Sequence, residues 1–385
     1  MYKRILEQKA LSSLKKYKVL ILTGPRQSGK STLSRMIGKG FDYVNLELPD
    51  VRELANTDPK GFFNRYTGNL IVDEIQYVPE LFSYVQAMVD SPAKGKKNPR
   101  RFILTGSQQF SLMERATQTL AGRARIFQLL PLSQKELKMA GIAGEVSVDE
   151  RMFKGGYPRI FNEGLDPSEW LAQYYLTYVE RDVRALKNIG DLEQFGRFLR
   201  VAASRAGQLA DYQSIARDVG ISQPTAKAWM SVLKASYVCL TLEPHFKNFG
   251  KRMIKSPKIY FYDTGLLCYL LKIKNAQQLS VHPLRGVIFE NWVLTEMMKD
   301  RVNIGEPIDF YFWRDQKGHE VDIVEEAADG LKLSEVKAAA TFHSDFVADM
   351  KFLNELQKST GGRVVYAGNE TFEFAGYKIV GWNDL

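Results

Sequence analysis

The chain has 385 residues, of which 45% are hydrophobic and 25% are charged, and its formal net charge is +9. This mixture is typical of globular proteins, and the length predicts roughly two to four domains rather than a single core. The positive excess favours association with polyanions. No run of residues approaches the roughly 20 apolar positions that a membrane span needs, which argues against an integral membrane protein.

The cysteines and the first residues indicate the compartment. The two cysteines, Cys239 and Cys268, form no CxxC pair, and the four histidines do not cluster near them. This pattern argues against a structural zinc site or a disulfide framework and favours a reducing environment. The N-terminal stretch is basic but lacks an apolar segment that ends in a small-residue cleavage site, so we expect a cytoplasmic protein.

The segment KVLILTGPRQSGKSTLSRMIG, residues 18–38, holds the most specific motif of the chain. An apolar run from Val19 to Leu22 precedes a turn bounded by Gly24 and Gly29, and an amphipathic pattern follows. A strand, a glycine-bounded loop and a helix are the context that the GxxxxGK[ST] motif requires. In such a loop the backbone N–H groups surround a phosphate at the N-terminus of a helix.

The motif assigns roles to individual residues. We predict that Lys30 reaches the β and γ phosphates of a nucleotide and that the Ser31 hydroxyl binds magnesium. The motif indicates a bound phosphate without distinguishing adenine from guanine. The predicted nucleotide-binding residues are Gly24, Pro25, Arg26, Gln27, Ser28, Gly29, Lys30, Ser31 and Thr32.

A second motif, GNLIVDEIQYVP, places two carboxylates directly after an apolar run from Leu70 to Val72. We predict that Asp73 holds the magnesium through water and that Glu74 polarises the attacking water. The alternative is that both carboxylates only cap the next helix. A third strand, RFILTGSQQF, ends in polar residues, and Ser107, with Thr105 as a second candidate, is predicted to sense the γ-phosphate.

The segment LAGRARIF adds two arginines, Arg123 and Arg125. One of them, with Arg123 as the first choice, is predicted to act as an arginine finger at the phosphate of a neighbouring subunit in a homo-oligomer. A surface ion pair is the alternative.

Together these segments resemble a known family. GPRQSGKST, LIVDEIQ, LTGSQQ and LAGR, followed by YFWRDQKGHEVDIVEE, are similar in order and spacing to prokaryotic AAA-family ATPases with a C-terminal domain of unknown function. The resemblance covers nearly the whole chain. It implies that ATP is the nucleotide, with Mg²⁺ as its metal, but it brings no settled biological role.

From Pro131 the pattern changes to amphipathic helices, which predict a helical lid. Four aromatic residues in this part are predicted to belong to a core rather than to a base-stacking surface: Trp170, Tyr174, Tyr175 and Tyr178. In the turn GGYPRIF, Arg159 is a candidate lid residue that approaches the nucleotide, although an arginine in a surface turn is common.

The segment from Ala210 to Phe246 has the pattern of a helix-turn-helix. We expect one helix from Tyr212 to Val219, a turn at Gly220 and a second helix that continues to Ala235. The strand YVCLTLEP after it suggests a winged form. The predicted DNA contacts are Gln223, Thr225, Lys227, Lys251 and Arg252.

A basic segment follows, with Lys247, Lys251, Arg252, Lys255 and Lys258 and no acidic residue before Asp263. Basic residues beside a helix-turn-helix favour contact with DNA phosphates. A winged helix that docks a protein domain, with a solvated charged face, is the alternative. The basic loop at residues 94–101 extends such a surface or is merely exposed.

The C-terminal part predicts a helix, three strands, a helix and a strand, the order of the restriction-endonuclease-like core. In EVDIVEEAADGLKLSEVK, residues 320–337, a hairpin places Asp322 beside Glu335, and Lys337 shares a strand face with Glu335. These residues, with Glu290 from the preceding helix, form a candidate magnesium-dependent nuclease site. An ordinary solvated hairpin, or a domain that binds DNA after losing activity, is the alternative.

The sequence thus predicts an α/β protein in four parts: a P-loop ATPase core (1–130), a helical lid (131–196), a winged helix-turn-helix (197–282) and a restriction-endonuclease-like domain (283–385). The predicted function is ATP hydrolysis linked to DNA remodelling or processing. Two alternatives remain open: a nucleotide-dependent switch that docks a protein partner without DNA, and a nuclease whose front domain only holds ADP.

Overall fold

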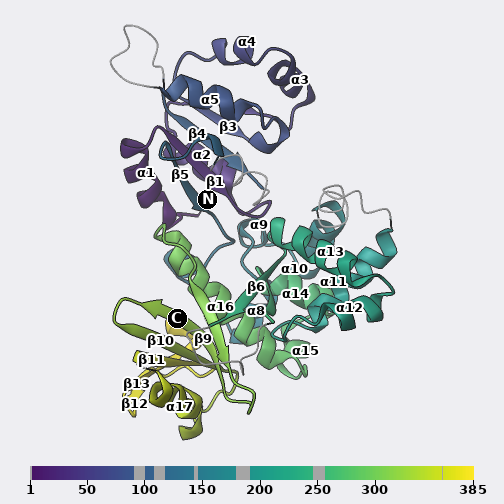
Figure 1. Cartoon of the computed structure of the whole chain (residues 1–385), viewed down its shortest axis with the longest axis vertical. Helices are drawn as coiled ribbons and strands as arrows, with labels where there is room; N and C mark the ends of the chain where they lie inside the picture. The colour runs from purple at the N-terminus through teal and green to yellow at the C-terminus, as the bar shows by residue number, and fades with distance from the viewer. Residues whose placement is uncertain are drawn as a thin grey trace. The chain divides into compact units, whose positions relative to one another are not determined.

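The computed structural model describes residues 2–90, 100–107, 118–142, 146–178, 191–245, 256–357 and 359–385. It divides into two compact units (Figure 1). Unit 1 comprises residues 1–132, 235–237 and 300–306, and unit 2 comprises residues 133–234, 238–299 and 307–385. The predicted four-part division remains a prediction.

Unit 1 is a parallel sheet with helices. Its strands are β1 (Val19–Thr23), β2 (Asp42–Asn45), β3 (Leu70–Asp73), β4 (Phe102–Gly106) and β5 (Ala124–Gln128). Its helices are α1 (Leu6–Lys16), α2 (Lys30–Ile37), α3 (Pro49–Thr57), α4 (Pro59–Asn64) and α5 (Leu81–Asp90). The strand order is β2-β3-β4-β1-β5, and every pairing is parallel. The predicted α/β fold is confirmed.

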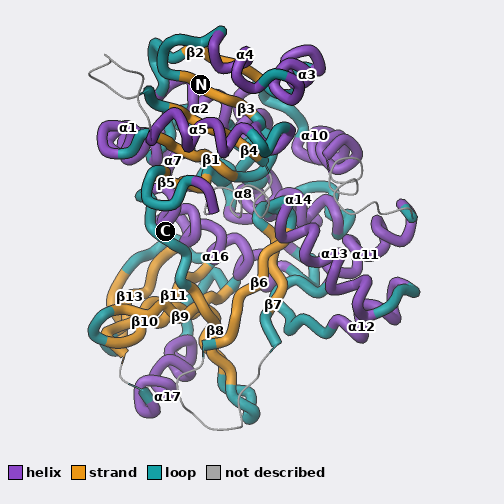
Figure 2. Tube along the Cα trace, turned by 45° about the horizontal axis from the view of Figure 1, so that its top comes forward, coloured by secondary structure: helices purple, strands orange, loops and turns teal. Residues whose placement is uncertain are grey.

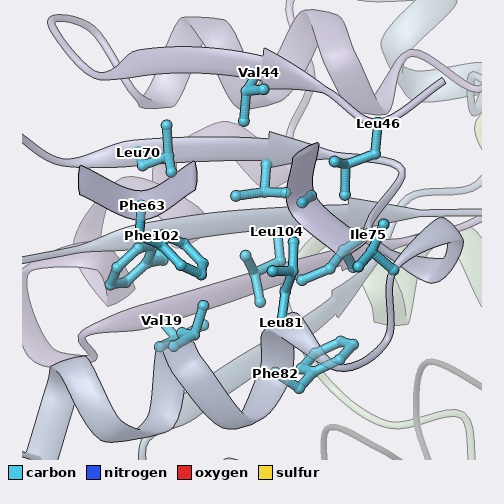
Figure 3. Packing of buried hydrophobic residues seen from close by; sticks show 14 of the residues in the cluster. Val19, Val44, Leu46, Phe63, Leu70, Ile75, Leu81, Phe82, Phe102 and Leu104 are labelled. Carbon is cyan, nitrogen blue, oxygen red and sulfur yellow. The ribbon is translucent and has the colours of Figure 1, made fainter. Parts of the chain in front are cut away.

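The apolar strands of this sheet are buried on both faces, as expected where helices cover a parallel sheet. Along β1 the side chains alternate between two cores: Val19 and Ile21 pack in one, and Leu20 and Leu22 in the other. Figure 3 shows the first core, where Val19, Phe102 and Leu104 lie among side chains from the neighbouring strands and helices. Because β1 lies between β4 and β5 and is buried on both faces, the start of the loop that follows it is fixed.

Unit 2 contains helices along its whole length. They are α7 (Gln134–Met139), α8 (Val148–Lys154), α9 (Pro158–Asn162), α10 (Pro167–Tyr174), α11 (Leu192–Ser204), α12 (Tyr212–Val219), α13 (Gln223–Ala235), α14 (Thr264–Leu270), α15 (Ala276–Ser280), α16 (Arg285–Asn303) and α17 (Ala348–Leu356). The end of α16, from residue 300, belongs to unit 1. The four aromatic residues predicted to be core are all buried, and Trp170 stacks on Tyr174 with ring centroids 5.2 Å apart.

A mixed sheet completes unit 2 (Figure 2). Its strands are β6 (Cys239–Pro244), β7 (Lys258–Phe261), β8 (Phe310–Arg314), β9 (Glu320–Ala327), β10 (Gly330–Lys337), β11 (Ser359–Tyr366), β12 (Phe372–Phe374) and β13 (Tyr377–Gly381). The order is β12-β13-β11-β10-β9-β8-β6-β7. Since β6 pairs in parallel with β8, the sheet contains strands from both sides of the predicted boundary at residue 283.

The C-terminal elements follow the predicted order: α16, β8, β9, β10, α17 and β11. The helices α12 and α13 have the predicted bounds, and Gly220 between them has the left-handed φ of 85° expected of a helix-ending glycine. The restriction-endonuclease-like and winged-helix assignments remain predictions. In the described part of the chain no helix is long and apolar enough to cross a membrane.

Candidate functional site

The phosphate-binding loop lies between β1 and α2, as the motif predicts. Gly24 has φ 145°, and a Cβ there would lie 2.1 Å from the Leu129 carbonyl oxygen, so only glycine fits beside β5. Gln27 and Gly29 have φ values of 61° and 97°. Left-handed residues of this kind turn successive N–H groups towards one concave side, which is how such loops bind anions.

Lys30 is the first residue of α2 and is only 4% exposed. Its Nζ atom donates to the carbonyl oxygens of Gly24 and Pro25, at 3.0 and 2.8 Å. Burial lowers the pKa of the Lys30 ammonium, and the nearby carboxylates of Glu74 and Asp73 oppose that shift. The lysine therefore lies over the loop, within the field of both predicted catalytic carboxylates.

Asp73 ends β3 and is 2% exposed. Its carboxylate accepts hydrogen bonds from the hydroxyls of Tyr43 and Thr105. Burial and the bond to Asp73 raise the pKa of Tyr43 to about 12, so Tyr43 remains a proton donor at neutral pH. A buried carboxylate whose oxygens are fixed from two neighbouring strands is suited to holding magnesium. The half-buried Ser31 hydroxyl offers a second oxygen ligand for the metal.

Glu74 is held by three polar side chains. Its backbone has φ 57°, and its N–H donates to Thr105 Oγ1 at 3.1 Å. Its Oε2 atom accepts from Ser107 Oγ at 3.2 Å and from Gln76 Nε2, and Gln76 also donates to Ser107 at 3.3 Å. The strand order explains this meeting, because β4 lies between β1 and β3.

The remaining loop residues have diverse environments. Arg26 donates to the Tyr77 hydroxyl at 2.9 Å and lies 3.5 Å from Glu47. The Ser28 hydroxyl is buried and has no hydrogen-bond partner within the described residues, whereas Gln27 and Thr32 are exposed. Pro25 is buried beside the loop lysine.

Sequence reasoning missed three residues of this site: Arg4, Tyr43 and Gln76. Arg4, which precedes α1, is 5% exposed and donates to the carbonyl oxygens of Ser28 and Leu130, at 2.7 and 2.6 Å. It therefore supports the phosphate-binding loop. No motif places Arg4 or Tyr43 at the site, because both are remote in sequence. Gln76 lies two residues after Glu74 in the segment DEIQ, and this proximity in sequence could have indicated its contact with Glu74.

The two arginine-finger candidates differ in their surroundings. Arg123 Nε lies 2.5 Å from Asp90 Oδ1, and both side chains are more than one third exposed. Arg125 donates to the Gly305 carbonyl at 2.6 Å, and its guanidinium lies 5.5 Å from the Phe127 ring centroid. Arg123 thus has the surface ion pair that was the alternative interpretation, and Arg125 is anchored within unit 1.

In unit 2 the predicted lid residue Arg159 lies on α9 and pairs with Glu163 at 2.8 Å. The predicted DNA contacts Gln223 and Lys227 are exposed on α13. Thr225 is half-buried, and its N–H and hydroxyl contact Ser222 Oγ at 3.2 and 2.7 Å, where Ser222 caps the helix. Lys251, Arg252 and the other basic residues of 246–255 lie outside the described residues, as do residues 94–99 of the basic loop.

The candidate nuclease residues lie on adjacent elements of unit 2. The Val336 N–H donates to Asp322 Oδ2 at 2.8 Å, and Lys337 Nζ donates to Glu335 Oε1 at 2.6 Å. Burial raises the pKa of Glu335 to about 7. Burial, together with the neighbouring Glu335 and Glu290, also raises the pKa of Asp322 well above its usual range.

Lys258 was predicted to belong to a basic surface, but the structure contradicts this. The side chain is 3% exposed, and its Nζ lies 3.1 Å from Glu290 Oε1, 4.0 Å from Asp322 Oδ1, and against Glu320. The sequence pattern misleads here because the acidic partners of Lys258 lie more than 30 residues away along the chain. Among the described residues no three acidic, histidine or cysteine side chains are arranged to hold one metal ion, and within this cluster Lys258 supplies a positive charge.

Family models match three parts of the chain. An AAA domain matches residues 16–138, a domain of unknown function (DUF8612) matches residues 145–277, and a second domain of unknown function (DUF4143) matches residues 285–385. The first match includes the phosphate-binding loop, Asp73, Glu74 and Ser107. The third includes the candidate nuclease residues.

Curated relatives and solved structures were also found. The uncharacterised proteins Rv2008c of Mycobacterium tuberculosis and Mb2031c of Mycobacterium bovis are each 33% identical over 328 residues, covering 84% of this chain and 71% of theirs. The Walker-type ATPase Paby2304 of Pyrococcus abyssi is 18% identical with a TM-score of 0.46, covering 70% of this chain and 96% of its own.

The RuvB Holliday junction branch migration motor of Thermotoga maritima is 17% identical with a TM-score of 0.30, covering 62% of this chain and 89% of its own. These two structural likenesses are too distant to carry an argument. The family matches and the mycobacterial relatives by themselves establish the family. The chain belongs to the family of AAA-type P-loop ATPases that carry a C-terminal DUF4143 domain.

Proposed function

We propose that the protein binds ATP with Mg²⁺ at the loop of residues 24–31 and hydrolyses it. The observation that carries this proposal is the convergence of Lys30, Asp73, Glu74 and Ser107 at the carboxyl edge of one parallel sheet. A loop that binds phosphate, a carboxylate for the metal and a second carboxylate for water are the parts that phosphoryl transfer requires.

Each residue has a role that follows from its chemistry. Lys30 exchanges its bonds to the loop carbonyls for bonds to phosphate oxygens, and the loop N–H groups bind the same phosphates. Ser31, and Asp73 through water, would hold Mg²⁺, which would neutralise charge on the phosphates. Glu74 accepts a hydrogen bond from the attacking water and orients it, and Ser107 lies beside Glu74 to respond to the γ-phosphate.

The test measures ATP binding and turnover separately. Lys30→Ala is expected to lose both. Glu74→Gln is expected to keep ATP binding within about threefold while turnover falls roughly 100-fold or more, the usual effect of losing a general base. Lys39→Ala, which removes an exposed lysine just beyond α2, is the matched control and should behave like the wild type. Unchanged turnover in Glu74→Gln would refute the assigned role.

We also propose that Arg123 acts at the ATP of a neighbouring subunit. Its guanidinium pairs with the exposed Asp90 and donates to the Ala121 carbonyl at 3.0 Å. An exposed ion pair contributes little free energy, so a phosphate can replace Asp90 as the partner of Arg123. Arg123→Ala and Glu74→Gln are each expected to be inactive alone. Mixing them should restore part of the turnover, because mixed neighbours combine one intact Arg123 with one intact Glu74.

Arg125→Ala is the matched arginine substitution, and it should lose stability rather than turnover because Arg125 is bound to Gly305. A mixture that stays inactive, or an Arg123→Ala protein with wild-type turnover, would contradict action between subunits.

For unit 2 we propose that α13 contacts DNA and that ATP turnover drives movement of the protein on it. The support is the exposed Gln223 and Lys227 near the start of α13, together with the positive net charge of the chain. The order of α12, the turn at Gly220 and α13 is that of a helix-turn-helix, whose second helix enters the major groove.

Duplex binding measured by fluorescence anisotropy at several salt concentrations tests this proposal. We expect log K to fall linearly with log salt, and Lys227→Ala to reduce the slope by about 1, the effect of one lost phosphate contact. Lys274→Ala, at another exposed lysine of unit 2, should leave the slope unchanged. If salt-dependent binding is absent, the switch that docks a protein partner becomes the better explanation.

A further inference from the structure

The acidic cluster of unit 2 contains a cation of its own. Glu290 on α16, Glu320 and Asp322 on β9, and Glu335 on β10 supply the carboxylates. Lys258, the first residue of β7, places its Nζ among three of them. The ring centroid of Phe312 lies 5.5 Å from the same atom, so the ammonium also has an aromatic neighbour.

Each carboxylate of this cluster has at least one protein partner, while the Oε2 atom of Glu335 is buried and has no hydrogen-bond partner within the described residues. Glu290 accepts from Lys258 and from the Tyr260 hydroxyl. Glu320 lies against Lys258 and 3.2 Å from Arg314. Asp322 accepts from the Val336 N–H, and Glu335 accepts from Lys337. These are bonds that oxygen ligands of a divalent ion would have to share or give up.

We propose that Lys258 is the resident cation of this cluster, that it excludes a divalent ion from Asp322 and Glu335, and that removing its charge creates a divalent-cation site there. A buried ammonium and a divalent ion at adjacent positions repel each other strongly, because little water screens them. Without Lys258, the half-buried Glu290 and the buried Asp322 lose the ammonium group that lies 3.1 and 4.0 Å from their oxygens. Hard oxygen donors of this kind are the ligands that Mg²⁺ and Mn²⁺ prefer.

This inference concerns unit 2 alone and does not rest on the ATPase proposal. It implies that unit 2 of the wild type does not cleave phosphodiester bonds by a metal-dependent reaction, since such cleavage requires the ion that Lys258 excludes. The proposed DNA binding by α13 can therefore fail or succeed independently of it.

The test is Mn²⁺ binding to the full chain without nucleotide, measured by the loss of the free-ion electron paramagnetic resonance signal. The proteins are the wild type, Lys258→Met, and each of these with Asp322→Asn, which subtracts ions held elsewhere. Lys332→Met, at an exposed lysine on β10, is the matched control. Lys258→Met is expected to gain one Asp322-dependent site that binds at least about tenfold more tightly than any in the wild type or in Lys332→Met.

Two results would overturn the proposal. One is a wild-type protein with an Asp322-dependent Mn²⁺ site as tight as that of Lys258→Met, or with plasmid cleavage that Asp322→Asn abolishes. The other is a folded Lys258→Met protein that gains no site. Lys258→Gln is a second variant in case the methionine prevents folding. If neither Lys258 variant folds, Mn²⁺ binding is compared between the wild type and Asp322→Asn. Equal binding by these two proteins upholds the proposal, and an Asp322-dependent site in the wild type overturns it.

Discussion

Glu74 has an unusual backbone for a residue with a side chain. Its φ of 57° lies in the left-handed region, which costs roughly 1–3 kcal/mol outside glycine unless the surroundings enforce it. Thr105 holds its N–H, and Ser107 and Gln76 hold its carboxylate. The conformation is thus fixed from three sides, which is how an orienting carboxylate can be held ready before the nucleotide binds.

Gln76 is therefore predicted to be a positioning residue for Glu74. In Gln76→Ala we expect kcat for ATP to fall about tenfold while KM changes less than about twofold, because the lost bond orients the carboxylate and touches no phosphate. Steady-state kinetics measure both values. Gln8→Ala, at an exposed glutamine of α1, is the control. A rise in KM with unchanged kcat would instead assign Gln76 to nucleotide binding.

Glu335 gives a prediction about pH. Its usual pKa of 4.5 is raised to about 7 by burial, so the folded state binds more protons than the unfolded state between these values. The free energy of unfolding should therefore fall as pH rises from about 4.5 to 7, by up to roughly 3 kcal/mol from this group.

Urea unfolding across this pH range measures the effect. Glu335→Gln cannot ionise at this position and should show a shallower fall than the wild type. Parallel curves for the two proteins would mean that Glu335 titrates normally in the folded state.

At the scale of elements, the loop between β1 and α2 depends on Gly24. An alanine there would need to move the Leu129 carbonyl, which directly follows β5, since its Cβ would lie 2.1 Å from that oxygen. Gly24→Ala is expected to lower the free energy of unfolding by at least about 2 kcal/mol. Gly40→Ala is the matched control, because Gly40 also has a left-handed φ, of 82°, but no atom lies within 4 Å of its Cβ position.

Unfolding by urea compares the two variants. The expected cost of Gly40→Ala is about 1 kcal/mol, the conformational penalty alone. Equal costs would show that the backbone near Leu129 relaxes freely, and the difference between the variants measures the close contact.

The elements that sequence predicted well are those whose signals are local. The strand, loop and helix around Lys30, the strand that ends at Asp73, and the bounds of α12 and α13 are all encoded within short segments. Lys258 illustrates the opposite case. A run of basic residues favoured a surface, yet β7 pairs with β6 and lies in the same sheet as β9, which brings Lys258 to Glu320 and Asp322. Such pairings depend on tertiary structure, which a local pattern does not contain.

At the scale of the whole molecule, unit 1 is not one continuous stretch. Residues 235–237 and 300–306 belong to it although they follow α13 and end α16. Tyr237 is 1% exposed, and its hydroxyl donates to Thr23 Oγ1 at 2.9 Å, immediately before the phosphate-binding loop. Gly305 accepts from Arg125 and has no space for a larger residue beside Phe127. The ATPase core is therefore completed by distant parts of the chain.

This arrangement predicts that Tyr237 supports the loop. Tyr237→Phe removes only the hydroxyl and leaves the buried Thr23 hydroxyl without that donor, so we expect the free energy of unfolding to fall by about 1–2 kcal/mol. Hydrogen exchange should quicken at the end of β1 and in residues 24–29 more than elsewhere in unit 1. Tyr84→Phe, at a half-buried tyrosine of α5, should not produce that local change. A fragment ending at residue 132 lacks both distant segments and should melt below the full chain; equal protection of the loop in the fragment and the full chain would mean that residues 1–132 suffice.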